Sequence, residues 1–105
     1  MSELPDQYLS IKKRFSKFFT AAKNLGKAAS TAGPLDAKTA NLIQLAAAAA
    51  IRSEGSVHSH VKRALEAGAN PDEIYHALIL TTSIIGFPTV SAALSWTDDV
   101  LMKKE

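Results

Sequence analysis

His60 is the residue of this chain best suited to chemistry, because an imidazole can take up and release a proton near neutral pH. It follows Val57 by three positions and precedes Ala64 by four, which places it at the edge of an apolar helical stripe. Ser53 and Ser56 precede it by seven and four positions and share that edge. We predict that His60 is a general acid/base in a small site. The alternative is a hydrogen-bonded structural histidine.

The two serines have a simpler explanation as capping and first-turn residues of this helix, since no acid nearby in the sequence completes a catalytic triad. Their hydroxyls could still orient His60 or line a ligand pocket. His76 belongs to the next predicted helix and is interpreted as an interface or pocket-wall residue rather than a catalyst, although it is a second candidate for titratable work. The predicted site therefore has His60 as the catalytic residue and Ser53, Ser56 and His76 as substrate-binding residues.

A metal site is another possible use of the histidines. His58 follows Glu54 by four positions on the same helix, and an ion that bridges them could recruit His76. His58 and His60 are two positions apart and point about 160° from each other on a helix, which argues against a pair of histidine ligands. The chain has no cysteine, which excludes thiolate ligands and disulfides. We expect no metal and no cofactor.

Five helices and no strand are expected to position these residues, because apolar residues recur at helical spacing and nowhere alternate convincingly with period two. Gly68 suits a left-handed position just past a helix end, and Asn70 with Glu73 matches a capping box, so a tight corner follows the His60 helix. Glycine–proline breaks stand at 33–34 and 86–88. The predicted helices run over about 6–29, 37–51, 53–67, 71–85 and 88–101.

Length and composition narrow the class of protein. With 105 residues the chain fits one domain, at the small end of what buries a self-sufficient core. Its basic excess belongs to the first predicted helix, whose lysine face invites a nucleic-acid or membrane interpretation. A solvated lysine face on a core-facing helix is the commoner case, and we expect neither partner. The N-terminus lacks the apolar core of a signal peptide, and the longest apolar run is too short to span a membrane, so a cytoplasmic protein is expected.

The predicted helix 71–85 is apolar on nearly all sides, with Ile79 and Leu80 opposite its main stripe. In a protein too small for a deep interior, such a helix is explained by burial against another subunit. The sequence therefore favours a homo-oligomer.

The order and spacing of these motifs resemble the carboxymuconolactone decarboxylase family, which includes the AhpD-like alkylhydroperoxidases. The resemblance implies an all-α, AhpD-like fold for a single domain over 1–105, and a homotrimer or homohexamer with sites near subunit contacts. It covers roughly residues 36–95, and its features are an alanine-rich helix, His60-Val61, Ala64-Leu65, Gly68, Pro71-Asp72-Glu73-Ile74, Ala77-Leu78 and Gly86-Phe87-Pro88.

Departures from the family pattern bear on the activity. The AhpD-like peroxidases carry a Cys-x-x-Cys pair where this chain has Ser53 and Ser56, and a glutamate where it has Asn41. A serine hydroxyl can neither reduce a peroxide nor form a disulfide, so thiol peroxidase activity is excluded. The lactone decarboxylases are similar in keeping the histidine, but they carry a glutamate at the place of Ser56 and an acidic residue near that of His76.

The resemblance implies a lyase-like protein that acts on a small anionic organic substrate, by lactone decarboxylation or related acid/base chemistry with His60. Arg52 or Lys62 could hold a substrate carboxylate. Both family carboxylates are replaced, so the alternative is a non-catalytic oligomeric module that binds a small molecule or serves assembly. Whether the protein is an enzyme stays open at this point.

Overall fold

The structure is a computed structural model that describes residues 6–102, and over that range it is helical without a strand. The all-α prediction is confirmed. The chain forms two compact units, an N-terminal unit Met1–Pro34 and a C-terminal unit Leu35–Glu105, and the assignment of all residues to one domain stays a prediction. The helices of the described part are α1 (Asp6–Arg14), α2 (Ser16–Ser30), α3 (Ala37–Ala50), α4 (Glu54–Glu66), α5 (Pro71–Ile79), α6 (Thr82–Ile85) and α7 (Phe87–Leu101).

Over the described residues 6–102, the five expected helices appear as seven helical segments, because two of the predicted helices are interrupted. The first interruption falls at Phe15, whose backbone leaves the helical region at φ −134° and ψ 59°. The bend is accompanied by an edge-on contact between the rings of Tyr8 and Phe19, whose centroids lie 4.8 Å apart. Neither α1 nor α2 has a buried residue, and the side chains of Phe18 and Leu25 are 66% and 72% exposed.

The second interruption separates α5 from α6. The hydroxyl of Thr81 donates to the carbonyl of Leu78 at 2.6 Å, and that of Thr82 donates to the carbonyl of Ile79 at 2.7 Å. Threonine side chains that bond to backbone carbonyls offer the chain an alternative to the helical hydrogen-bond ladder. The predicted continuous helix over 71–85 is therefore wrong at its centre.

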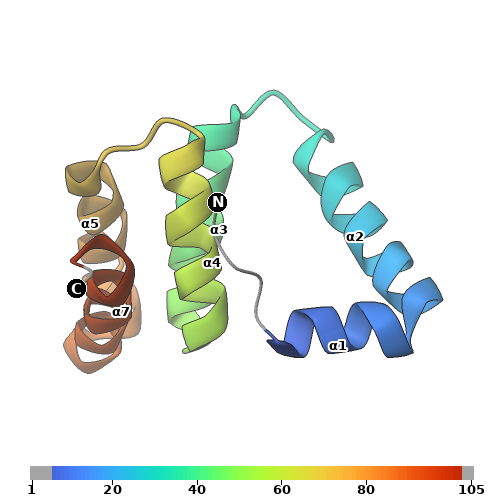
Figure 1. Ribbon diagram of the computed structural model, residues 1–105. Coiled ribbons are helices and arrows are strands. Elements are labelled where there is room, and N and C mark those ends of the chain that lie inside the picture. Colours follow the sequence, from blue (N-terminus) through green and yellow to red (C-terminus); the bar gives the residue numbers. More distant parts are fainter. Residues whose placement is uncertain (1–5, 103–105) are drawn as a thin grey trace. The chain divides into compact units, whose positions relative to one another are not determined.

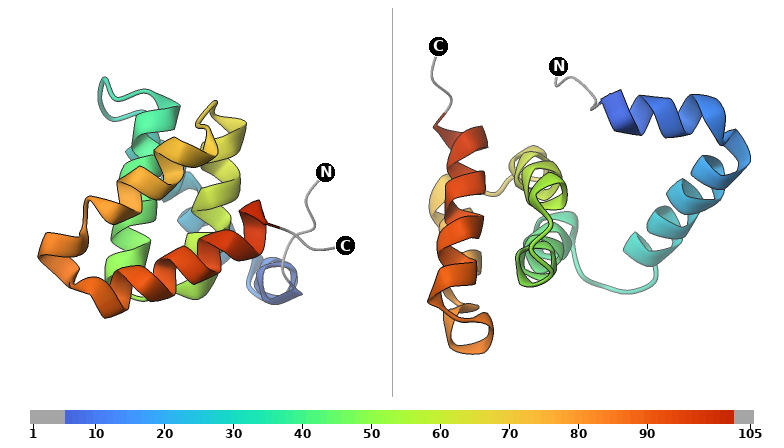
Figure 2. Two further views of the ribbon diagram at one scale, coloured as in Figure 1. Left: turned by 90° about the vertical axis from the view of Figure 1, so that its left-hand side faces the viewer. Right: turned by 90° about the horizontal axis from the view of Figure 1, so that it is seen from below.

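The C-terminal unit has two helical layers, with α3 beside α4 in one and α5 with α7 in the other (Figure 1). The left view of Figure 2 shows α5 and α7 lying across α3 and α4. The buried hydrophobic cluster lies between these layers, and burial there is the main stabilising contribution. It comprises Leu45, Ala48, Ala49, Val57, Val61, Ala64, Ala69, Ile74, Leu78 and Ala93.

Polar side-chain links join adjacent helices around this core. They connect α4 to α3 on one edge and to α7 on the other. The links are Asn41–His60 between α3 and α4 (3.3 Å), His58–Asp99 between α4 and α7 (3.0 Å), Tyr75–Asp98 between α5 and α7 (2.6 Å), and Lys38–Glu73 between α3 and α5 (2.9 Å).

The predicted start of α3, end of α4 and start of α5 are confirmed. Asp36 caps α3 by accepting from the backbone N–H of Thr39 at 2.8 Å. Asn70 and Glu73 form the reciprocal capping box of α5, and Gly68 has the expected left-handed backbone with φ 99°. In the part of the chain that the structure describes, no helix is long and apolar enough to cross a bilayer.

Candidate functional site

Helix α4 presents His60 as the sequence predicts. Val57, Val61 and Ala64 are fully buried on one side of the helix, and His60 is half-buried at the edge of that stripe. The helix ends in a Schellman arrangement, in which the N–H of Ala69 donates to the carbonyl of Ala64 at 2.9 Å. The imidazole is therefore carried by a helix that is fixed both by its buried side and by its end.

Asn41 of α3 is the polar partner of His60. Its side-chain N–H donates to the carbonyl of Ala37 at 2.9 Å, which turns the amide oxygen toward His60 Nδ1 at 3.3 Å. An amide oxygen only accepts hydrogen bonds, so we assign the proton of the neutral ring to Nδ1. Nε2 then carries the lone pair and is the ring nitrogen that can take a proton from a ligand.

The charge state of His60 follows from its surroundings. Burial, followed by the nearby positive charge of Arg63, lowers the pKa of His60 below its ordinary value. The ring is therefore neutral near pH 7. Arg63 lies three positions after His60 on the same helix and is exposed, so its guanidinium adds positive charge beside the imidazole.

Ser53 and Ser56 are half-buried and lie on the His60 edge of α4 by helical geometry. Ser53 occupies the N-cap position, but its hydroxyl makes no capping hydrogen bond, so the simpler capping explanation is wrong for this side chain. Its backbone instead links the helices, because its N–H donates to the carbonyl of Ala48 at 3.0 Å. The Ser53 hydroxyl is thus not used to cap α4.

His76 takes a different direction from the other candidates. It lies two positions from both Ile74 and Leu78, which are fully buried, so its exposed side chain stands on the outward side of α5. Between His76 and His60 the structure shows no hydrogen bond within residues 6–102. The chain therefore brings His60 together with Asn41 and Arg63, and it does not bring His76 to them.

Arg52, one of the two cations proposed from the sequence, has a hydrogen-bond partner away from His60. The guanidinium of Arg52 donates to the hydroxyl of Thr89 at 3.0 Å and so serves the start of α7. Arg63 is the cation beside His60. Its position three residues after His60 on the same helix is the sequence feature that could have identified it. Asn41 could be found from its position where relatives carry a glutamate.

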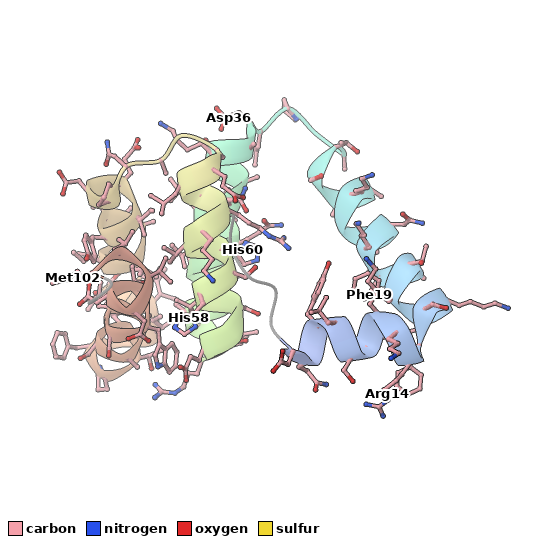
Figure 3. All side chains as sticks on the ribbon, in the orientation of Figure 1. Arg14, Phe19, Asp36, His58, His60 and Met102 are labelled. Atoms are coloured by element: carbon pink, nitrogen blue, oxygen red, sulfur yellow. The ribbon has the colours of Figure 1, made fainter. Side chains whose placement is uncertain are left out.

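His58 and His60 leave α4 on opposite sides, as their spacing predicts (Figure 3). The imidazole of His58 meets the carboxylate of Asp99 on α7, with 3.0 Å between Nε2 and Oδ2. The two histidines therefore belong to different surroundings. A separate surface depression of about 360 Å³ is lined by the α2 residues Ser16, Lys17, Thr20, Ala21 and Asn24, none of which is a site candidate.

Comparison with known protein families decides the affiliation. The model of the carboxymuconolactone decarboxylase family matches residues 16–99, which is most of the chain. The chain belongs to this family. A comparison with curated proteins finds no match. For the carboxymuconolactone decarboxylase family the match begins at the first residue of α2, so the shared region extends beyond the roughly 36–95 expected from motifs.

In this member of the carboxymuconolactone decarboxylase family a neutral amide, Asn41, faces the histidine from the preceding helix. A carboxylate there would stabilise a protonated imidazole, whereas an amide oxygen orients the ring without adding charge. The contact therefore favours an oriented, neutral histidine with the lone pair on Nε2.

Proposed function

We propose that the α3–α4 edge around His60 binds a small anionic organic molecule and moves a proton between His60 Nε2 and a substrate carbon. The observation that carries this proposal is the contact of Nδ1 with Asn41, which leaves Nε2 as the acceptor. Arg63 supplies positive charge for a substrate carboxylate. Membership of the carboxymuconolactone decarboxylase family makes lactone decarboxylation the first reaction to test.

The chemistry of such a step is simple to balance. The bond between the lactone and its carboxylate breaks, carbon dioxide leaves, and the electron pair stays as an enolate conjugated with the lactone carbonyl. A neutral His60 takes a proton from water at Nε2 and delivers it to the carbon, and the hydroxide that remains combines with the carbon dioxide to give bicarbonate. Arg63 offsets the negative charge during the reaction. Thiol peroxidase chemistry stays excluded because the chain has no cysteine.

Enclosure of the site is proposed to come from a homotrimer or homohexamer. Large apolar side chains remain exposed on the single chain, with Phe18 66%, Leu25 72% and Ile84 83% exposed, which supports burial against further copies. Ser53 and Ser56 would line the site from α4. His76 faces away from the core of its own chain, so its predicted place in the site would require a neighbouring copy to bring it there.

The test is a reaction of the full chain with carboxymuconolactone in D₂O, followed by NMR of the product. We expect loss of the carboxylate and deuterium at the protonated carbon, both abolished in His60→Gln and retained above background in Ser53→Ala. Exposed Gln44, one turn after Asn41 on α3, gives the control variant Gln44→Ala, which should react as the wild type does.

Two other outcomes are informative. Saturable binding of the lactone without turnover, seen as a thermal shift that His60→Gln removes, would support the non-catalytic binding module instead. A His60→Gln protein that turns the lactone over as fast as the wild type would contradict the proposed role of His60.

A further inference from the structure

A second group of ionisable side chains lies on the opposite edge of α4 from His60. Glu54 and His58 are four positions apart on this helix, and Asp99 faces them from α7. One potential ligand atom from each of the three lies within 4.8 Å of the others. His58 is half-buried, while Glu54 and Asp99 are exposed. This group takes no part in the chemistry proposed for His60.

We propose that Glu54, His58 and Asp99 form a site for a divalent transition-metal ion of the zinc, copper or nickel class. One imidazole nitrogen with two carboxylates suits these ions, whereas calcium and magnesium prefer ligand sets made only of oxygen. Three protein ligands leave a fourth position of a tetrahedral ion for water. No metal is expected from the sequence, in which Asp99 lies 41 positions from His58. Only the packing of α7 on α4 brings Asp99 to the other two residues.

The geometry needs little change to accept an ion. Ligand bonds of about 2.0–2.2 Å place two ligands of a tetrahedral ion roughly 3.3 Å apart. Nε2 of His58 and Oδ2 of Asp99 are already 3.0 Å apart, so an ion would replace the proton that they share. Glu54 stands one turn before His58 on the same side of a rigid helix, and rotation of its exposed side chain closes the remaining distance.

The charge around the group also favours a cation. In the described part of the chain, no lysine or arginine forms an ion pair with Glu54 or Asp99. The neighbouring carboxylate of Asp98 is engaged by the hydroxyl of Tyr75 at 2.6 Å, on the side of α7 that faces α5. Two carboxylates therefore meet a single imidazole, and a bound dication balances their charge. The ion would also tie the first turn of α4 to the last turn of α7.

The experiment is a titration of the untagged, EDTA-treated full chain with zinc chloride by calorimetry, and with cobalt(II) by visible absorption. We expect one equivalent to bind and the melting temperature to rise, since a ligand that binds only the folded state stabilises it. Trp96 precedes Asp99 by three positions and is the sole tryptophan, so copper(II) should quench its fluorescence.

Matched variants locate the ion. His58→Ala and Asp99→Asn should weaken zinc binding by about tenfold or more, because loss of even an outer partner of a metal site has that effect. Glu54→Gln should weaken it as well. Asp72→Asn removes an exposed carboxylate in the first turn of α5, outside the group, and should bind as the wild type does. Absence of saturable zinc binding by the wild type, or unchanged binding by a folded His58→Ala protein, would overturn the proposal.

Discussion

Replacing Asn41 with Ala separates the two possible roles of the α3–α4 link. If Asn41 mainly orients His60, the variant changes the state of the ring but hardly changes the free energy of unfolding. If the link is structural, stability falls. The contact joins the amide oxygen of Asn41 to Nδ1 of a half-buried ring over 3.3 Å, which is at the long end for a hydrogen bond.

The expected change in stability is small because two terms oppose each other. A neutral hydrogen bond contributes about 0.5–1.5 kcal/mol net, and a long, half-exposed one stands near the lower figure. Alanine in place of asparagine inside a helix gains roughly 0.5 kcal/mol of helix propensity. The substitution also removes the side-chain bond from Asn41 to the carbonyl of Ala37. That carbonyl keeps its helical partner, the backbone N–H at position 41. The net change in unfolding free energy should lie within about 0.5 kcal/mol of zero.

Two measurements check this prediction, both with EDTA present. Urea unfolding gives the free energy, and ¹⁵N NMR of the ring nitrogens gives the tautomer of His60, which is one of three histidines and can be assigned with single variants. We expect the Nδ1-protonated form in the wild type and in Gln44→Ala, and a redistribution toward Nε2–H in Asn41→Ala. An unchanged tautomer, or a loss of more than about 2 kcal/mol, would refute the reasoning.

Three further predictions concern the scaffold. Thr97 is fully buried and its hydroxyl donates to the carbonyl of Ala93 at 2.8 Å. In urea unfolding, the free energy of unfolding of Thr97→Val should differ from that of the wild type by less than about 1 kcal/mol. Thr97→Ser should lose about 1 kcal/mol because it lacks the buried methyl group. A loss above about 2 kcal/mol in Thr97→Val would show that the hydroxyl matters more. Arg52 has a left-handed backbone with φ 56°, so Arg52→Gly should be more stable than Arg52→Ala by about 1 kcal/mol in the same assay, and the reverse order would contradict backbone strain. The capping bond from the Asn70 N–H, followed by Lys38, lowers the pKa of Glu73 from its ordinary 4.5. The ionised Glu73 carboxylate therefore contributes to the free energy of unfolding fully above pH 4.5, and this contribution is lost as the pH falls through the folded-state pKa. Acid should reduce the stability of Glu73→Gln less than that of the wild type. Equal losses would count against the link.

Local signals in the sequence were sufficient for the start of α3, the end of α4 and the start of α5. Asp36, Gly68 and the pair Asn70 and Glu73 act through residues no more than five positions away, and each takes the predicted part. The position of His60 at the edge of a buried stripe was also predictable, because it depends only on the period of one helix.

The remaining features depend on contacts between distant residues. The break at Phe15 has no glycine or proline to announce it, and it goes with packing of Tyr8 on Phe19. The meeting of His58 with Asp99 depends on how α7 lies against α4, which helical periodicity does not give. For the same reason His76 was grouped with His60, although its side chain leaves the outward side of another helix.

The lack of buried residues in α2 has a consequence for hydrogen exchange. A helix of 15 residues that buries nothing is marginal in water, so its amides open locally at little free-energy cost. The amides of α4 lie above fully buried Val57 and Val61 and should exchange only in larger openings. Deuterium uptake in α2, compared with uptake in α4 of the same sample, therefore reports on assembly. The amides of α2 exchange slowly only when another protein surface covers the apolar stripe of Phe18 and Leu25.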